Sequence, residues 1–70
     1  MSEYVRNTVY QFRTKHGMTQ ETLAEKTGVS RQTIIAIEKG NYTPSVLLAM
    51  IIAHTFNASV EDVFSVGYEK

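Results

Sequence analysis

Residues 20–40, QETLAEKTGVSRQTIIAIEKG, decide the fold of this chain. They contain two amphipathic segments that meet at Gly28, and each segment is too short to form a stable helix alone. Thr19 and Ser30 each precede a segment and can cap its first free amides. Gly28 stands where the first segment must end, at a position that favours a positive φ. We therefore expect two short helices that cross at a steep angle.

The spacing of small and apolar residues inside this stretch is that of a helix-turn-helix. Ala24 lies where two crossed helices approach most closely, while Ile34 and Ile37 share the inner face of the second helix. The outer and leading surface of that helix is then formed by Ser30, Arg31, Gln32, Thr33, Ile35 and Ala36. Arg and Gln side chains have the forked geometry that reads base edges in the DNA major groove. An ordinary helical hairpin with solvated polar residues is the alternative that spacing alone leaves open.

The segment MTQETLAEKTGVSRQTIIAIEKGNYTPS, residues 18–45, resembles the helix-turn-helix domains of the phage repressor and Cro type, also called the XRE type. The similarity runs from about residue 5 to residue 64 and includes IEKG, the Pro44-Ser45 pair and the closing SVEDVF. The resemblance implies an all-α, five-helix, repressor-like domain with a central helix-turn-helix that binds DNA.

The length and composition fit one small globular domain. We place it at residues 1–70, with a core at about residues 5–64 and a C-terminal tail at 65–70 that we expect to be frayed. The chain has no cysteine, so disulfides and thiolate-bound zinc cannot reinforce its core. It is 43% hydrophobic and 20% charged, as in globular proteins. It shows no signal peptide and no apolar run long enough to span a membrane, so we expect a cytoplasmic protein.

The charges are distributed unevenly although the formal net charge is zero. Residues 1–43 hold six Lys or Arg and four Glu, a net of +2, whereas residues 44–70 hold one Lys and three acidic residues, a net of −2. This weak dipole gives a single copy little attraction for DNA phosphates. Two copies on a two-fold symmetric site would double the phosphate contacts, which favours a homodimer.

The first helix is expected at residues 4–16, where Val5, Val9 and Phe12 form a single apolar stripe. Arg13 lies beside this stripe. In the proteins that the chain resembles, an arginine at this position pairs with the glutamate that corresponds to Glu38. We therefore expect an ion pair that ties the first helix to the third, with a free surface arginine as the alternative. The structural residues are Arg13, Glu38, Ala24, Gly28, Ile34 and Ile37.

A fourth helix is expected at residues 46–56, after the cap Ser45, and a short fifth helix after Ser59, where SVED has the capping-box form. The fourth, VLLAMIIAHTF, has nine apolar residues in eleven. Its domain-facing residues are expected to be Val46, Ala49, Ile52, Ala53 and Phe56. Leu47, Met50 and Ile51 are then left outside, although related sequences commonly place Glu or Lys at positions 47 and 51. We expect a homodimer contact formed by Leu47, Ile51, Ala58, Val66 and Tyr68. A patch covered by the chain's own C-terminal tail is the alternative.

Contacts with DNA are assigned from the position of each side chain in the motif. We expect Arg31 to contact guanine and Gln32 to contact adenine, and Ile35 and Ala36 to contact thymine methyl groups. Phosphate contacts are expected from Gln20, Ser30, Thr33, Lys39, Asn41 and Tyr42. For Gln20, at the start of the second helix, the family resemblance supports this role.

Catalytic patterns are not found in the sequence. His16 and His54 lie in different predicted helices, with no Asp, Glu or Cys at a ligand or triad spacing. We expect no enzyme activity, metal, cofactor, small-molecule ligand or membrane partner. The expected function is sequence-specific binding of double-stranded DNA by a dimeric transcriptional regulator, most simply a repressor. The same fold used as a protein-interaction module, in an antitoxin or a complex subunit, is the alternative, and an enzyme ranks third.

Overall fold

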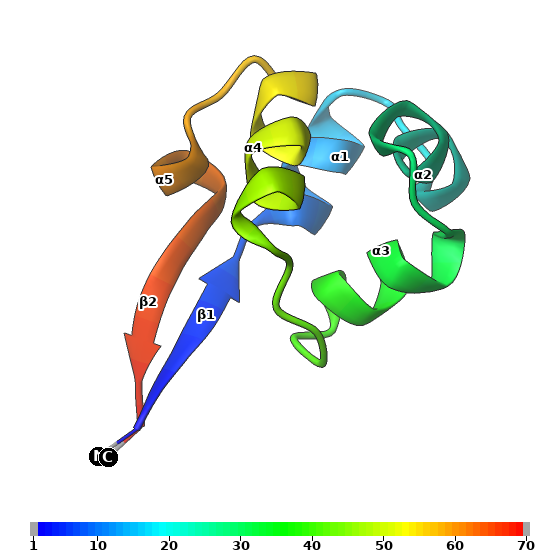
Figure 1. Cartoon of the computed structure of the whole chain (residues 1–70). Coiled ribbons are helices and arrows are strands. Elements are labelled where there is room, and N and C mark those ends of the chain that lie inside the picture. Colours follow the sequence, from blue (N-terminus) through cyan, green and yellow to red (C-terminus); the bar gives the residue numbers. More distant parts are fainter. Residues whose placement is uncertain (1, 70) are drawn as a thin grey trace.

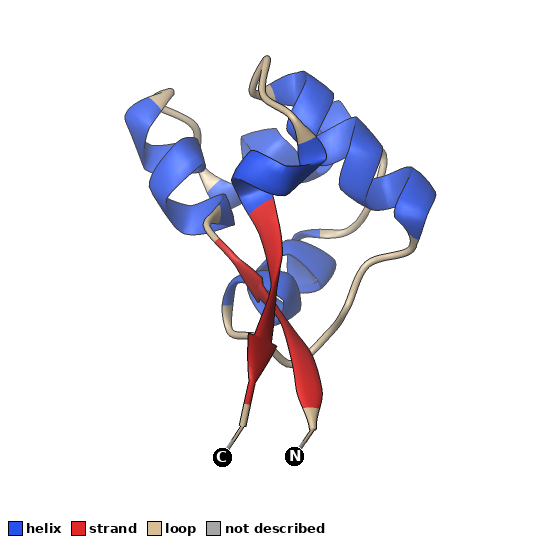
Figure 2. Ribbon diagram, turned by 90° about the vertical axis from the view of Figure 1, so that its left-hand side faces the viewer, coloured by secondary structure: helices blue, strands red, loops and turns tan. Residues whose placement is uncertain are grey.

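The computed structural model describes residues 2–69, which form five helices and two strands (Figure 1). In chain order these are β1 (Glu3–Asn7), α1 (Val9–Lys15), α2 (Gln20–Thr27), α3 (Arg31–Glu38), α4 (Val46–Thr55), α5 (Val60–Val63) and β2 (Phe64–Tyr68). The helices cluster together, and the two strands extend from the cluster as a twisted ribbon (Figures 1 and 2). None of the helices between residues 2 and 69 has the length and apolar character needed to cross a membrane.

Helices α2 to α5 each begin at the cap that the sequence predicts. The hydroxyl oxygens of Thr19, Ser30 and Ser45 each accept a hydrogen bond from the backbone N–H three residues further on. Ser59 does the same and completes a capping box with Asp62. Each cap satisfies an amide that has no partner within its helix and contributes about 1 kcal/mol. Helix α4 ends at Thr55, one residue before the predicted end, because Phe56 leaves the helical conformation as its C-cap.

The hydrophobic core lies between the helices and receives side chains from each of them. Its largest fully buried residues are Val9, Leu23, Ile34, Ile37, Ile52 and Val63. Small residues stand where helices approach one another, and Ala24 and Ala53 are both buried. The buried hydroxyl of Thr27 donates to the Leu23 carbonyl oxygen at 2.8 Å, so this polar group does not weaken the core.

The prediction of an all-α fold was wrong at both ends of the chain. The helix expected at residues 4–16 begins only at Val9, and the residues before it form β1. This strand pairs antiparallel with β2, in a register that places Glu3 opposite Tyr68 and Asn7 opposite Phe64. Residues 65–68 of the tail expected to fray therefore belong to β2, and the Glu69 N–H donates to the Ser2 carbonyl oxygen, while residue 70 lies outside the described residues.

Asn7 and Thr8 separate the strand from the helix. The Asn7 carboxamide oxygen accepts from the Val9 N–H at 3.1 Å, while its nitrogen donates to the Ile37 carbonyl oxygen at 2.9 Å. The Thr8 N–H donates to the Val63 carbonyl oxygen at 2.8 Å. These bonds end β1, start α1 and attach the base of the ribbon to α3 and α5. Val5 packs against the core from the strand, although its spacing from Val9 and Phe12 also fits a helix.

On one face of the ribbon, an aromatic ring packs over a glycine of the neighbouring strand. Tyr4 lies opposite Gly67 in the strand register. A Cβ atom at Gly67 would stand 2.5 Å from Cζ of Tyr4, so the ring lies directly over the glycine. Packing of an aromatic side chain over a cross-strand glycine compensates for the side chain that glycine lacks. A side chain at position 67 would therefore require the Tyr4 ring to move.

Candidate nucleic-acid interface

The turn between α2 and α3 is fixed by its backbone. Gly28 has a φ of 75°, in the left-handed region where a side chain would be strained. The N–H groups of Gly28 and Val29 donate to the carbonyl oxygens of Glu25 and Ala24, which closes the last turn of α2. Ser30 then caps α3. Only residues 28–30 separate the two helices, so their crossing is held rigidly, as the helix-turn-helix pattern predicts.

Helix α3 has two distinct faces. Ile34 and Ile37 are fully buried in the core. Arg31 and Gln32 are exposed at the beginning of the helix, and Ile35 and Ala36 are partly exposed one turn later. At 3.6 residues per turn Gln32, Ile35 and Ala36 lie on the side away from the buried pair, and Arg31 lies at the edge of that side, one turn before Ile35. The residues assigned to base edges therefore share one outward surface, with the charged and polar members at its N-terminal end.

Ser30 and Thr33, which we assigned to phosphates, are occupied within the helix cap. The Ser30 hydroxyl oxygen accepts from the Thr33 N–H at 3.2 Å and lies 3.0 Å from the Thr33 hydroxyl. A phosphate would have to share these hydroxyls with the cap. The structure thus gives both residues a role in starting α3, beside any role in binding.

The segment after α3 brings three further candidate residues to the surface. Gly40 has a φ of 80° and turns the chain away from the helix axis. The Asn41 N–H then donates to the Ala36 carbonyl oxygen at 2.9 Å, which ties the segment to the helix end. Lys39, Asn41 and Tyr42 are exposed. Helix α3 therefore has an exposed cation near its start, at Arg31, and another just past its end, at Lys39.

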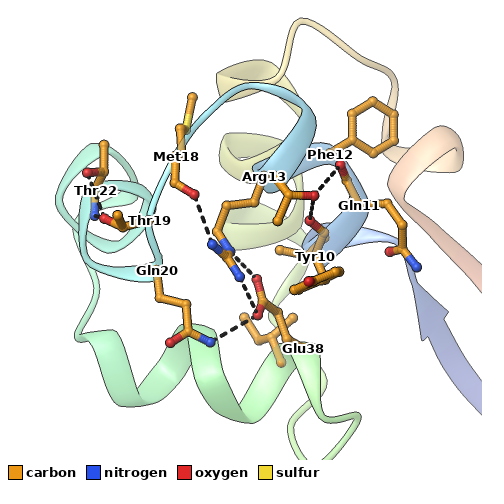
Figure 3. Close-up of polar contacts among 12 residues, drawn as sticks. Tyr10, Gln11, Phe12, Arg13, Met18, Thr19, Gln20, Thr22 and Glu38 are labelled. Carbon is orange, nitrogen blue, oxygen red and sulfur yellow. Dashed lines mark hydrogen bonds and ion pairs between the residues drawn. The ribbon is translucent and has the colours of Figure 1, made fainter.

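Behind this surface, a buried network joins α1, α2 and α3 (Figure 3). The guanidinium Nε of Arg13 donates to Oε2 of Glu38 at 2.6 Å, and the two side chains are only 10% and 7% exposed. The Nη1 of Arg13 donates to the Met18 carbonyl oxygen at 2.8 Å, and the guanidinium lies 5.3 Å from the centre of the Tyr10 ring. The ion pair expected from the resemblance is thus present, and it is enclosed by further contacts.

Gln20, assigned to a phosphate, belongs to the same network. Its side-chain nitrogen donates to Oε1 of Glu38 at 3.1 Å. Gln20 is half-buried and also borders an open surface depression, whose lining residues are Arg13, Gly17, Met18, Thr19, Gln20, Glu21 and Arg31. The link between Gln20 and Glu38 was not predicted. Gln20 is the first residue of α2 and Glu38 is the last residue of α3, and no pattern in a single sequence indicates that two such residues are in contact.

A second exposed surface lies on α4 and the ribbon. Of the residues predicted to form a dimer contact, Leu47, Val66 and Tyr68 are exposed, while Ile51 and Ala58 are half-buried. Met50 is also exposed. An apolar groove runs between the ribbon and the start of α4, lined by Val5, Thr43, Pro44, Val46, Ala49, Met50, Val60 and Phe64. Phe64, Val66 and Tyr68 alternate along β2 and so share one ribbon face.

One expectation about this surface was wrong, and so was the alternative of a patch covered by the C-terminal tail. Val46 was predicted to face the domain but is 77% exposed. It points to the same side of α4 as Ala53, but two turns earlier, where the open groove replaces the core. The chain's own tail does not cover Leu47, which stays 69% exposed because β2 pairs with β1 instead. Val46 therefore joins the exposed apolar surface of α4, where Met50 was expected to lie, and neither residue was among those predicted to form the dimer contact.

Comparison with known proteins agrees with this geometry. The model of the helix-turn-helix family matches residues 9–63. An uncharacterized HTH-type transcriptional regulator of Archaeoglobus fulgidus is 55% identical over 60 residues, which cover 86% of each chain. The solved structure of the clp gene regulator ClgR from Corynebacterium glutamicum has a TM-score of 0.73 at 33% identity, covering 77% of this chain and 57% of that one. The restriction-modification controller protein C.AhdI from Aeromonas hydrophila also has a TM-score of 0.73, at 26% identity, covering 77% of this chain and 82% of that one.

The family match spans α1 to α5 and leaves out both strands of the ribbon. The predicted resemblance to repressor and Cro-type domains is confirmed, because the match contains the capped α2 and α3, the turn at Gly28 and the surface with Arg31 and Gln32. The chain belongs to the helix-turn-helix family of DNA-binding transcriptional regulators.

Proposed function

We propose that this regulator binds a two-fold symmetric operator as a homodimer and represses transcription by occupying it. The observation that carries the proposal is the two-faced α3, which buries Ile34 and Ile37 and presents Arg31 and Gln32 outward at its N-terminal end. A recognition helix enters the major groove with this end, where its side chains reach base edges.

The proposed assignments divide the contacts by kind. Arg31 reads guanine and Gln32 reads adenine through paired hydrogen bonds, and Ile35 and Ala36 meet thymine methyl groups. Gln20, Lys39, Asn41 and Tyr42 contact phosphates on either side of the groove, with Ser30 and Thr33 contributing through the shared cap. Phosphate contacts position the protein, whereas base contacts specify the sequence.

The homodimer is supported by exposed apolar surface and by charge. Leu47 and Val46 are each more than two-thirds exposed on a helix with almost no polar residues, and the groove beside them continues onto the ribbon. Such a surface on a small domain marks an interaction site. A zero formal charge leaves one copy with few phosphate contacts, so a pair of recognition helices would supply the affinity that one lacks. We therefore extend the proposed dimer contact to Val46 and Met50.

Selection of bound fragments from random double-stranded DNA tests the whole proposal. The expected result is a palindromic site whose half-sites lie one helical turn apart, about 34 Å, or a multiple of it. A single unrepeated half-site would contradict the dimer, while recovery of unenriched sequence would contradict base reading.

The same fold acting as a protein-interaction module is the second candidate. The zero net charge and the exposed apolar surface on α4 favour it. Measuring the affinity for DNA against salt concentration separates the two functions. A DNA-binding regulator loses affinity linearly on a log–log plot, with a slope set by the number of phosphates contacted. A protein-interaction module would show weak binding without a preferred sequence.

A further inference from the structure

We propose that Glu38 is a positioning residue for DNA binding, because its carboxylate fixes the orientation of the Gln20 side-chain amide. The inference rests on the proposed phosphate contact of Gln20. It assigns a function in recognition to a residue that is itself almost entirely buried and whose obvious role is to hold Arg13.

The geometry of the network allows only one orientation of the amide. Oε1 of Glu38 accepts from the Gln20 nitrogen at 3.1 Å and from Nη2 of Arg13 at 3.3 Å (Figure 3). An ionised carboxylate has acceptors and no donor, so the nitrogen end of the Gln20 amide must face it. A glutamine without such a partner exchanges its oxygen and nitrogen ends by rotation about its last side-chain bond.

The fixed end is the one that a phosphate requires. Phosphate oxygens only accept hydrogen bonds, so the Gln20 oxygen would repel them and only the nitrogen can donate. The nitrogen carries two hydrogens, of which Glu38 takes one and leaves the other for an acceptor. Gln20 borders the open depression together with Arg31, so this second hydrogen belongs to a group next to the proposed base-reading end of α3.

Arg13 makes the arrangement compatible with a nearby phosphate. A lone carboxylate behind Gln20 would repel the DNA backbone. The guanidinium of Arg13 contacts both Glu38 oxygens, at 2.6 and 3.3 Å, and neutralises them. The pair therefore presents no net charge to a phosphate, while the Gln20 nitrogen keeps one hydrogen that Glu38 does not take. A donor fixed before binding loses less conformational freedom when the complex forms.

The Glu38→Gln variant tests this role, because the change in DNA affinity that we expect is opposite to the change expected from charge alone. Removing a negative charge near DNA should tighten binding in the absence of positioning. We expect instead a loss of about three- to ten-fold, because a carboxamide has only one oxygen for the donors from Arg13 and Gln20 that the two carboxylate oxygens accept, so an acceptor for the Gln20 nitrogen is no longer assured. Binding is measured by fluorescence anisotropy on the selected DNA site, at a temperature where circular dichroism shows each variant folded. The matched control is Glu25→Gln, which removes an exposed carboxylate from α2 and should bind equally or more tightly.

Gln20→Met, alone and combined with Glu38→Gln, shows whether Glu38 acts through Gln20. The methionine keeps the length of the side chain and removes both hydrogen-bonding groups. We expect the double variant to bind no more weakly than the worse single variant, since both changes remove one contact. Losses that multiply, or an affinity of Glu38→Gln equal to that of Glu25→Gln, would overturn the proposal.

If Glu38→Gln does not fold, a measurement on the unmodified chain still tests the positioning role of Glu38. Nuclear magnetic resonance of the side-chain amides should show the Gln20 NH₂ group as rigid, and those of the exposed Gln11 and Gln32 as mobile. Gln20→Met identifies its signals by their loss. A Gln20 amide as mobile as that of Gln11 would refute the positioning role. Since this experiment contains no DNA, its result is independent of whether the proposed operator binding is correct.

Discussion

The α2–α3 unit and the terminal ribbon show two different ways in which a sequence specifies structure. In α2–α3, caps, a positive-φ glycine and apolar spacing lie within residues 19–40, and each can be read locally. In the ribbon, β1 pairs with a strand that begins 57 residues after its own end, and each strand has its hydrogen-bonding partner only in the other. Local signals therefore predicted the helical unit, while the ribbon depends on long-range pairing. Variants in the two regions should show whether they also differ in stability and function.

Arg13→Ala should have the largest effect, since it leaves the buried Glu38 carboxylate without its counter-ion. Breaking a buried pair from one side costs about 3–5 kcal/mol, a large part of the about 5–15 kcal/mol that stabilises a small domain. Urea unfolding followed by circular dichroism should show a strongly lowered midpoint. Arg6→Ala, at an exposed arginine of β1, is the control and should change stability by less than about 0.5 kcal/mol. Equal midpoints for the two variants would show that the pair does not hold the helices together.

The contacts that join α1, α2 and α3 differ in how well the sequence predicts them. The Arg13–Glu38 pair was accessible only through the family resemblance, since residues 25 positions apart carry no local signal of contact. The buried positions Ile34 and Ile37 followed from helical periodicity alone. The hydrogen bond from Gln20 to Glu38 followed from neither, because it depends on the angle at which α2 crosses α3.

Arg31→Ala and Gln32→Ala should have the second-largest effect, and this effect is on DNA binding, whereas that of Arg13→Ala is on stability. Each should weaken binding to the selected operator by about 1–3 kcal/mol and relax the preference at one base pair. Anisotropy titrations against the operator and its single-base variants measure both effects. Lys26→Ala, on exposed α2 surface, is the control and should leave the preference intact. A uniform loss across all sequences would assign the residue to a phosphate.

Val66→Glu asks whether the ribbon contributes to function as well as to the fold. Val66 is 54% exposed on the ribbon face that continues the apolar groove, so we expect the charge to raise the dimer dissociation constant by about ten-fold or more while the domain stays folded. Sedimentation velocity measures the dimer fraction. Ser65→Glu, one residue away and on the opposite face, should leave association unchanged. If both variants dissociate equally, charge repulsion and not the apolar face explains the result.

The ribbon had signals that could have been recognised. Phe64, Val66 and Tyr68 alternate with small or polar residues, which is the period of a half-buried strand. The alternation covers only five residues at the end of the chain, where fraying is the common outcome. Residues 4–7 were ambiguous, since Val5 fits the helical spacing of Val9 and Phe12 equally well. The partner strand resolves this ambiguity, and its identity depends on where the folded helices bring the two chain ends.

Gly67→Ala should have the smallest effect and gives the most direct measure of how weakly the ribbon is held. The added methyl group collides with the Tyr4 ring, but Tyr4 is 46% exposed and its ring can swing into solvent. We expect a loss of about 1 kcal/mol, which corresponds to one cross-strand contact. The loss should nearly disappear in a Tyr4→Ala background, where the methyl group meets no ring and alanine has the better strand propensity. Urea unfolding of the four proteins gives this comparison. An undiminished loss in the Tyr4→Ala background would mean that the backbone at Gly67, and not the ring above it, requires glycine.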